Sequence, residues 1–149
     1  MQTPIVLVII SILFLISIAV SYKYGRCTAE CEMLRGFYES NKEFNDEAGI
    51  TSFTFYIGDY TNGTYNVYLL MISNDEEKIL INSPTEMTLT TIWNYGDGHY
   101  EYNATFADLN SEFIPNNIIM KHYSRSGKLI LSDSSDTIYG CLFKNPVLT

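Results

Sequence analysis

The feature that most constrains this chain is an uncharged apolar run near its N-terminus. The run covers residues 4–20, and the first charged side chain of the whole protein is Lys23. A helix of about 17–19 residues, at about 1.5 Å per residue, reaches about 25–29 Å, which is close to the hydrocarbon thickness of a bilayer. We therefore predict a single-pass membrane helix over residues 4–22, within an N-terminal anchor at residues 1–26.

The residues that follow the run favour an anchor that is retained. We expect Tyr22 and Tyr24 to lie at the level of the lipid headgroups, with Lys23 and Arg26 reaching the phosphates. A cleaved signal peptide is the alternative, because a small-x-small pattern ends at Ser21. The first three residues carry no Lys or Arg, however, as a signal peptide would require.

The charges around the run also predict its orientation. Lys23 and Arg26 follow the run and no basic side chain precedes it, which places the C-terminal part on the cytosolic side. Two glycosylation sequons, at Asn62 and Asn103, would fit the opposite topology. Chance sequons are expected in a chain rich in Asn and Thr, so we expect neither asparagine to carry a glycan.

The three cysteines are Cys27, Cys31 and Cys141. An odd number does not resemble the even disulfide framework of a small secreted fold, and this again favours the cytosolic side. Cys27 and Cys31 lie four residues apart beside the predicted membrane helix, so they are candidates for palmitoylation. Free reduced thiols are the alternative.

Residues 27–149 form one acidic, β-rich domain in this interpretation. All 17 acidic and all 9 basic residues lie after the apolar run, which leaves the chain with a net charge of −8. Such a domain repels nucleic acid, and no basic stripe interrupts it. His99 and His122 have no ligand or catalytic partner at a recognisable spacing, so we expect ordinary surface or half-buried histidines. We predict no enzyme activity, no cofactor and no metal site.

The rest of the chain reads as short strands separated by turns. We expect helical turns at residues 28–40 and 42–48, and the strand-like runs then begin. Eight runs at hairpin spacing predict an all-β antiparallel meander, closed as a small lipocalin-like barrel or doubled as a sandwich. The runs lie at residues 52–57, 65–72, 78–81, 87–93, 99–106, 118–123, 128–131 and 137–143.

Alternation along these runs predicts which side chains point inward. Tyr100, Tyr102, Ala104 and Phe106 share one face of their strand, and we assign that face to the barrel interior. An eight-stranded barrel is either filled by such side chains or just wide enough for one small ligand. We expect a filled interior, which makes a small-molecule ligand the less favoured partner.

Tyrosine is unusually frequent, at 12 of 149 residues. Tyrosine offers a large contact area at low entropic cost and is enriched at protein interfaces. Three tyrosines at strand ends or beside turns are therefore our candidate partner contacts, because full burial is harder there: Tyr60, Tyr65 and Tyr95.

Four stretches of the domain carry a family resemblance: GFYE at residues 36–39, EAGITSFTFYIG at 47–58, SGKLILSD at 126–133 and IYGCLFK at 138–144. Together they resemble the small membrane-anchored β-domain proteins of the virions of large icosahedral DNA viruses, especially those that infect algae. The opening Gly-aromatic pair also looks like the start of a lipocalin-type barrel. The resemblance implies a minor capsid or membrane-associated structural role.

Our leading interpretation is a non-enzymatic structural protein. Its helix lies in an internal virion membrane, and its β-domain contacts capsid or other shell proteins on the cytosolic or capsid side. The membrane helix raises the effective concentration of the domain near the shell, so that a modest interface suffices. Two alternatives stay open: a membrane-tethered, lipocalin-like module that binds a small apolar ligand, and a secreted or surface domain released after Ser21.

Overall fold

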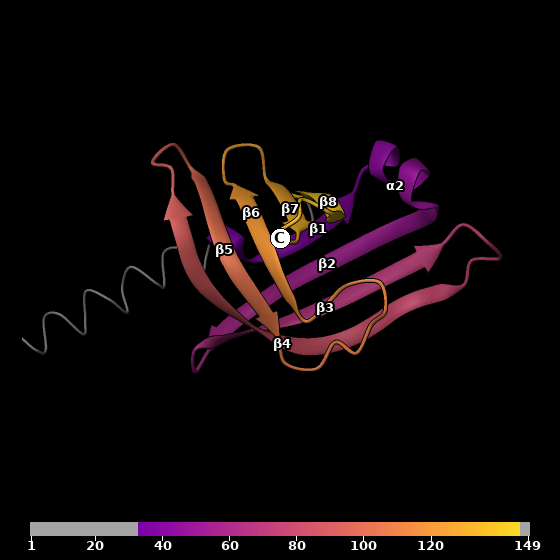
Figure 1. The fold of residues 1–149 in the computed structure, drawn as a ribbon, viewed down its shortest axis with the longest axis horizontal. Coiled ribbons are helices and arrows are strands. Elements are labelled where there is room, and N and C mark those ends of the chain that lie inside the picture. Colours follow the sequence, from indigo (N-terminus) through magenta and orange to yellow (C-terminus); the bar gives the residue numbers. More distant parts are fainter. Residues whose placement is uncertain (1–32, 147–149) are drawn as a thin grey trace, which may run out of the picture. The chain divides into compact units, whose positions relative to one another are not determined.

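The structure is a computed structural model that describes residues 33–146. These residues form eight strands and one short helix (Figure 1). The elements are β1 (Gly36–Ser40), α2 (Lys42–Ala48), β2 (Ile50–Thr61), β3 (Thr64–Ser73), β4 (Ile79–Asn94), β5 (His99–Phe106), β6 (Asn117–Tyr123), β7 (Lys128–Ser132) and β8 (Ile138–Lys144).

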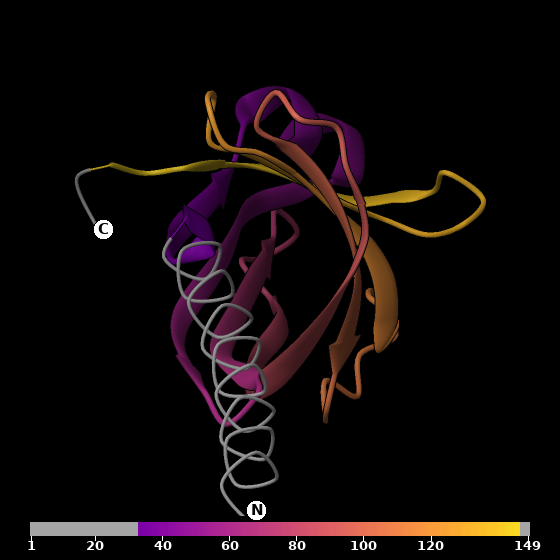
Figure 2. The same cartoon turned by 90° about the vertical axis from the view of Figure 1, so that its left-hand side faces the viewer.

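The eight strands close into an antiparallel barrel in which each strand pairs with its neighbour in sequence. β1 completes the ring by pairing with β8, where Tyr38 lies opposite Lys144. In the view of Figure 2, the strands follow one another around a ring. The prediction of an all-β meander barrel is confirmed, and the barrel rather than the sandwich is the form adopted.

The predicted membrane helix, at residues 4–22, lies outside the described residues. Within residues 33–146, no helix is long and apolar enough to span a membrane.

Two of the predicted elements are wrong. Residues 36–40, which we expected to be helical, form β1, the strand that closes the barrel. The runs at 78–81 and 87–93 are parts of one strand, β4, which passes through Pro84. Near Pro84, β4 pairs with β3 alone, and its pairing with β5 begins only at Met87. Pro84 therefore lies beside an edge that is open at that level, where a missing N–H is tolerated.

The helical turn predicted at residues 42–48 is confirmed as α2. The side chain of Asn41 accepts a hydrogen bond from the backbone N–H of Phe44 (2.9 Å) and caps the N-terminus. Gly49 ends the helix at a positive φ of 69° and donates its N–H to the carbonyl of Asn45.

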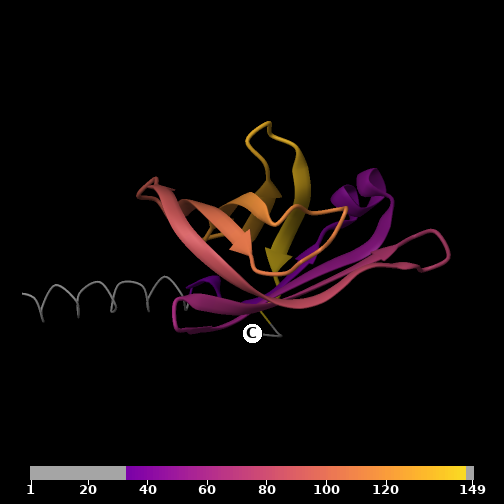
Figure 3. The same ribbon diagram turned by 60° about the horizontal axis from the view of Figure 1, so that its bottom comes forward.

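The connections between strands alternate between two rims of the barrel, because all neighbours are antiparallel. The chain enters β1 at what we call the entry rim, which also holds the β2–β3, β4–β5 and β6–β7 hairpins and the end of β8. The far rim holds α2, the β3–β4 turn, the β5–β6 loop and the β7–β8 turn. Figure 3 shows the β4–β5 hairpin at the left and α2 at the right.

Inward-facing side chains from all eight strands are buried between the two rims. Toward the far rim, Phe55 packs against Phe106 with their ring centroids 6.1 Å apart. Leu109 and Ile114 of the β5–β6 loop are buried there, and Leu34 is buried at the entry rim. The predicted inward face is confirmed, since Tyr102, Ala104 and Phe106 are buried, whereas Tyr100 is only partly buried.

Candidate functional site

A groove lies between α2 and the outer face of β8, and we call it the α2–β8 groove. Its volume is about 730 Å³. Apolar side chains from widely separated parts of the chain line it, among them Phe44, Ile50, Leu80, Phe113, Ile138 and Phe143.

The alternation of β8 separates this groove from the barrel interior. Gly140 and Leu142 are buried in the core, whereas Tyr139, Cys141 and Phe143 point outward and line the groove. A Cβ atom on Gly140 would lie only 2.9 Å from a methyl carbon of Leu142, which shows how tightly the core packs behind the groove floor. The concave space therefore lies on the outer face of β8, and at the far rim it reaches the core residues Ile50 and Met71.

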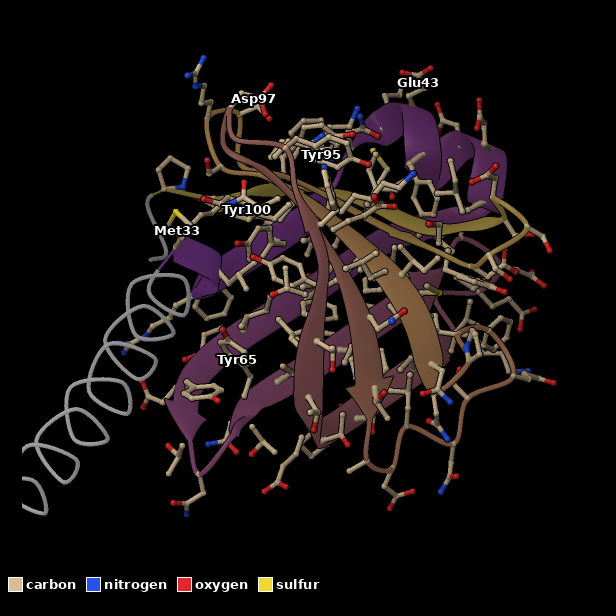
Figure 4. The ribbon with its side chains drawn as sticks, turned by 60° about the vertical axis from the view of Figure 1, so that its left-hand side comes forward. Met33, Glu43, Tyr65, Tyr95, Asp97 and Tyr100 are labelled. Carbon is tan, nitrogen blue, oxygen red and sulfur yellow. The ribbon has the colours of Figure 1, made fainter. Side chains whose placement is uncertain are left out.

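Acidic side chains flank the groove. Glu43 and Glu47 of α2 line it, and Glu43 points away from the barrel in Figure 4. Glu43 and Glu47 are both exposed. The groove also reaches Lys128, a cation at the start of β7. A ligand in this groove would meet apolar side chains on its floor and carboxylates at one margin.

Asp133 organises the β7–β8 turn beside the groove. Its carboxylate accepts hydrogen bonds from the backbone N–H groups of Thr137 (3.0 Å) and Ser135 (2.9 Å) and from the hydroxyl of Tyr139 (2.9 Å). The bond from the Thr137 backbone, followed by that from Tyr139, holds the pKa of Asp133 below its usual value. The bond to Asp133 in turn raises the pKa of the Tyr139 hydroxyl. The groove wall is thus hydrogen-bonded in place.

Charge is distributed very unevenly between the two rims. The following counts include each connection and the three residues on either side of it. The far rim carries eleven acidic residues (Glu39, Glu43, Asp46, Glu47, Asp75, Glu76, Glu77, Asp108, Glu112, Asp133, Asp136) and two basic ones (Lys42, Lys78). The entry rim carries five basic residues (Arg35, Lys121, Arg125, Lys128, Lys144) and three acidic ones (Asp59, Asp97, Glu101). Eleven of the fifteen acidic residues in the described part of the chain therefore surround the far rim.

A row of aromatic rings crosses the outer wall near the entry rim. Tyr95 stacks on His99 at 4.3 Å, and His99 stacks on Tyr123 at 4.1 Å. Trp93 meets Tyr95 edge-on at 6.4 Å, and the ammonium of Lys128 lies 5.9 Å from the centre of the Tyr123 ring. We call Trp93, Tyr95, His99 and Tyr123 the aromatic row.

A hydrogen bond holds the exposed end of this row. The hydroxyl of Tyr95 donates to a carboxylate oxygen of Glu101 (2.7 Å), and this bond raises the pKa of Tyr95. Trp93 and Tyr95 remain at least half exposed, at 59% and 50%. Figure 4 shows Tyr95 and, at the tip of the β4–β5 hairpin, Asp97. The row thus presents large aromatic surface to its surroundings.

His122 lies inside the barrel and is only 1% exposed, so the prediction of a surface or half-buried residue is wrong for it. Its ring meets that of Tyr38 edge-on at 6.4 Å, and within residues 33–146 its Nδ1 atom has no hydrogen-bond partner. Burial, with a smaller effect from the charge of Lys144, lowers the pKa of His122 to about 4. At neutral pH it is therefore an uncharged core residue.

The three predicted partner contacts differ in their exposure. Tyr60 and Tyr95 are exposed, whereas Tyr65 is only 3% exposed. Tyr65 is the second residue of β3, its side chain faces inward and its ring lies 4.9 Å from that of Tyr60, so the expectation of an accessible Tyr65 is wrong. Other predicted site residues lie outside the described part of the chain: Tyr22, Lys23, Tyr24, Arg26, Cys27 and Cys31. Cys141 is a free, partly buried thiol in the groove.

Between residues 33 and 146, no three His, Cys, Asp or Glu side chains gather in a way that could hold a metal ion. No family model, no curated protein and no solved structure matches this chain. The functional assignment therefore depends on the geometry and charge of the surface.

Proposed function

We propose that this protein is a non-enzymatic structural protein that holds a β-barrel beside a membrane and docks a protein partner at the far rim. Residues 4–22 would form its single-pass anchor. One observation carries the proposal: the α2–β8 groove lies on the outer face of β8 and opens among the acidic residues of the far rim. A tether attached at the entry rim leaves that surface accessible to a partner.

The chemistry of the groove favours a particular kind of partner segment. Its apolar floor, with Phe44, Phe113 and Phe143, suits apolar anchor side chains. The carboxylates of Glu43 and Glu47 suit Lys or Arg residues that flank those anchors, and they would speed association through charge attraction. We therefore infer a basic, apolar-anchored segment of a shell protein. In line with the family resemblance, that shell would be the capsid around an internal virion membrane.

Site-specific photo-crosslinking of the full chain in assembled particles tests this proposal. A photoreactive residue replaces Phe113 in the groove, and a matched control replaces Thr90, an exposed residue on the wall of β4. We expect one discrete adduct with a shell protein from position 113 and none from position 90. Glu43→Lys combined with Glu47→Lys should abolish it. Equal adducts from both positions, or none from position 113, would contradict docking in the groove.

The anchor is tested separately by extraction with alkaline carbonate and by intact mass. We expect the protein to copurify with particles, to stay with the membrane fraction and to keep residues 1–22. A mature chain that begins at Tyr22 would support release as a secreted or surface domain instead.

Asn62 and Asn103 are both exposed, so either would be accessible if the barrel were in the lumen. A glycan on either would reverse the proposed topology.

The volume of the groove favours a second candidate, a small apolar ligand. About 730 Å³ falls within the range of about 300–1,000 Å³ that is usual for ligand pockets. The ligand would then lie in the α2–β8 groove and not in the barrel interior, as a lipocalin-like module would hold it. A saturable thermal shift of several degrees with fatty acids or sterols, lost in Phe113→Asp, would favour this candidate over protein docking.

A further inference from the structure

We infer that the entry rim is a lipid-contacting surface, which rests on an anionic membrane with Trp93 at the level of the headgroups. This inference rests on the anchor of the proposed function and adds a second membrane contact, made by the barrel itself.

The first observation is the short connection between the predicted membrane helix and the barrel. The chain enters the barrel at Leu34, and only eleven residues separate it from the predicted helix end at residue 22. Even fully extended, eleven residues span at most about 36–40 Å. The chain thus joins the barrel at the entry rim, and the length of this segment limits how far that rim can lie from the membrane.

The second observation is the aromatic surface at that rim. Ile92 (44%) and Trp93 (59%) are exposed next to each other where β4 ends, and Tyr60 is exposed near the β2–β3 hairpin. Figure 1 shows the end of β4 and the β2–β3 hairpin at the same end of the barrel. Trp and Tyr are the residues enriched at membrane–water interfaces, because their rings are apolar and their N–H or O–H groups are polar.

The third observation is charge. Arg125 is exposed in the β6–β7 hairpin, and Lys128 and Lys144 lie at the adjoining strand ends. Two hydrogen bonds hold these segments together at the rim: Ser124 N–H to the carbonyl of Gly98 (2.8 Å), and Lys144 N–H to the carbonyl of Gly127 (2.9 Å). Anionic lipids attract the basic entry rim and repel the acidic far rim, so both effects turn the same rim toward the membrane.

Trp93 is the single tryptophan of the chain, so its fluorescence reports on this surface alone. Full-length protein is reconstituted in vesicles of phosphatidylcholine and phosphatidylglycerol, with or without brominated acyl chains. In these vesicles we expect the Trp93 emission to be shifted to the blue and to be quenched by the brominated lipid. Aqueous iodide should quench Trp93 less than it does when the protein is in vesicles of phosphatidylcholine alone. Flotation of the vesicles reports separately on the anchor.

Matched variants test the charge contribution. Arg125→Gln with Lys128→Gln should weaken the quenching of Trp93 by brominated lipid. Each lost cation should lower the equilibrium constant for contact between the barrel and the anionic lipid about fivefold. Lys42→Gln with Lys78→Gln, at the far rim, should leave the quenching unchanged. Protein that floats with the vesicles but keeps a water-exposed Trp93 would overturn this inference alone. Protein that does not float would overturn the anchor and this inference with it.

Discussion

The two ends of the barrel interior have different chemistry. Toward the far rim the core is mostly apolar, with Phe55 against Phe106 and Leu109 buried nearby, and Ser132 is a buried polar residue there. Toward the entry rim it contains the buried polar side chains of Tyr38 and His122. The hydroxyl of Tyr38 donates to the carbonyl of Leu34 (2.7 Å), so a polar core residue also holds the segment that enters the barrel. Stability should therefore respond differently to mutation and to pH at the two ends.

The outer surface shows the opposite contrast. The outer surface of the far rim, which surrounds the more apolar end of the core, is strongly acidic. The outer surface of the entry rim, which surrounds the more polar end, is basic and aromatic. The interior thus determines whether the barrel stays folded, whereas the charges outside determine which neighbour each rim attracts. Mutations in the core and at the two rims should therefore separate these contributions.

The largest effect should come from the apolar end of the core. Phe106→Ala removes a side chain that is 2% exposed and leaves a cavity beside Phe55, so the free energy of unfolding should fall by about 3–5 kcal/mol. Urea denaturation at neutral pH measures this loss. Phe113→Ala, which shortens an exposed side chain of the β5–β6 loop, is the matched control. A loss below 1 kcal/mol for Phe106→Ala would contradict its place in the core.

The polar end of the core should make stability depend on pH. His122 has a pKa of about 4 in the folded barrel, against about 6.5 when unfolded, so between these values the unfolded chain binds more protons. Its contribution is complete above pH 6.5 and is lost as the pH falls toward 4, by about 3 kcal/mol. Denaturation curves at pH 7 and pH 4.5 should show this loss.

Two variants isolate the histidine from the acidic residues. In His122→Gln the difference between pH 7 and pH 4.5 should shrink, whereas His99→Gln on the outer wall should keep it. If both variants show the same pH dependence as the unaltered protein, His122 does not carry the effect.

An intermediate effect is expected at the hairpins of the entry rim. Gly98 and Gly96 both have positive φ values, 88° and 83°, so an Ala at either should cost about 1–2 kcal/mol. Only at Gly98 would the new methyl group also collide with the hydroxyl of Ser124, whose hairpin is hydrogen-bonded to it. Gly98→Ala should therefore destabilise more than Gly96→Ala in thermal unfolding. Adding Ser124→Ala should remove the excess, and an unchanged excess would argue against the collision.

The smallest effect on stability should come from the acidic margin of the groove. Glu43→Lys with Glu47→Lys changes two exposed side chains of α2, so the free energy of unfolding should move by less than about 0.5 kcal/mol. The same change should abolish docking of the basic partner segment. Unfolding curves and the crosslink yield from position 113, measured on one preparation, separate the two. A large loss of stability would mean that α2 has a structural role.

Much of the barrel could be predicted because strand alternation and turn residues are local signals. The turns at residues 94–98 and 124–127 and the inward face of β5 follow from them directly. The number of strands was correct partly by coincidence, since β1 was missed and β4 was divided at Pro84. A five-residue strand such as β1 is determined by its pairing with β2 and β8, and that pairing is not a local signal.

The apolar run, the acidic character of the domain and its all-β class can be read from the residues alone, because these properties depend on composition and short-range periodicity. The burial of His122 and Tyr65, and the groove in which α2, the β5–β6 loop and the outer face of β8 meet, depend instead on how the strands pair. Strand pairing also separates the charges between the two rims. The acidic residues are scattered along the chain, and they gather at one rim because an antiparallel barrel alternates its connections between two ends.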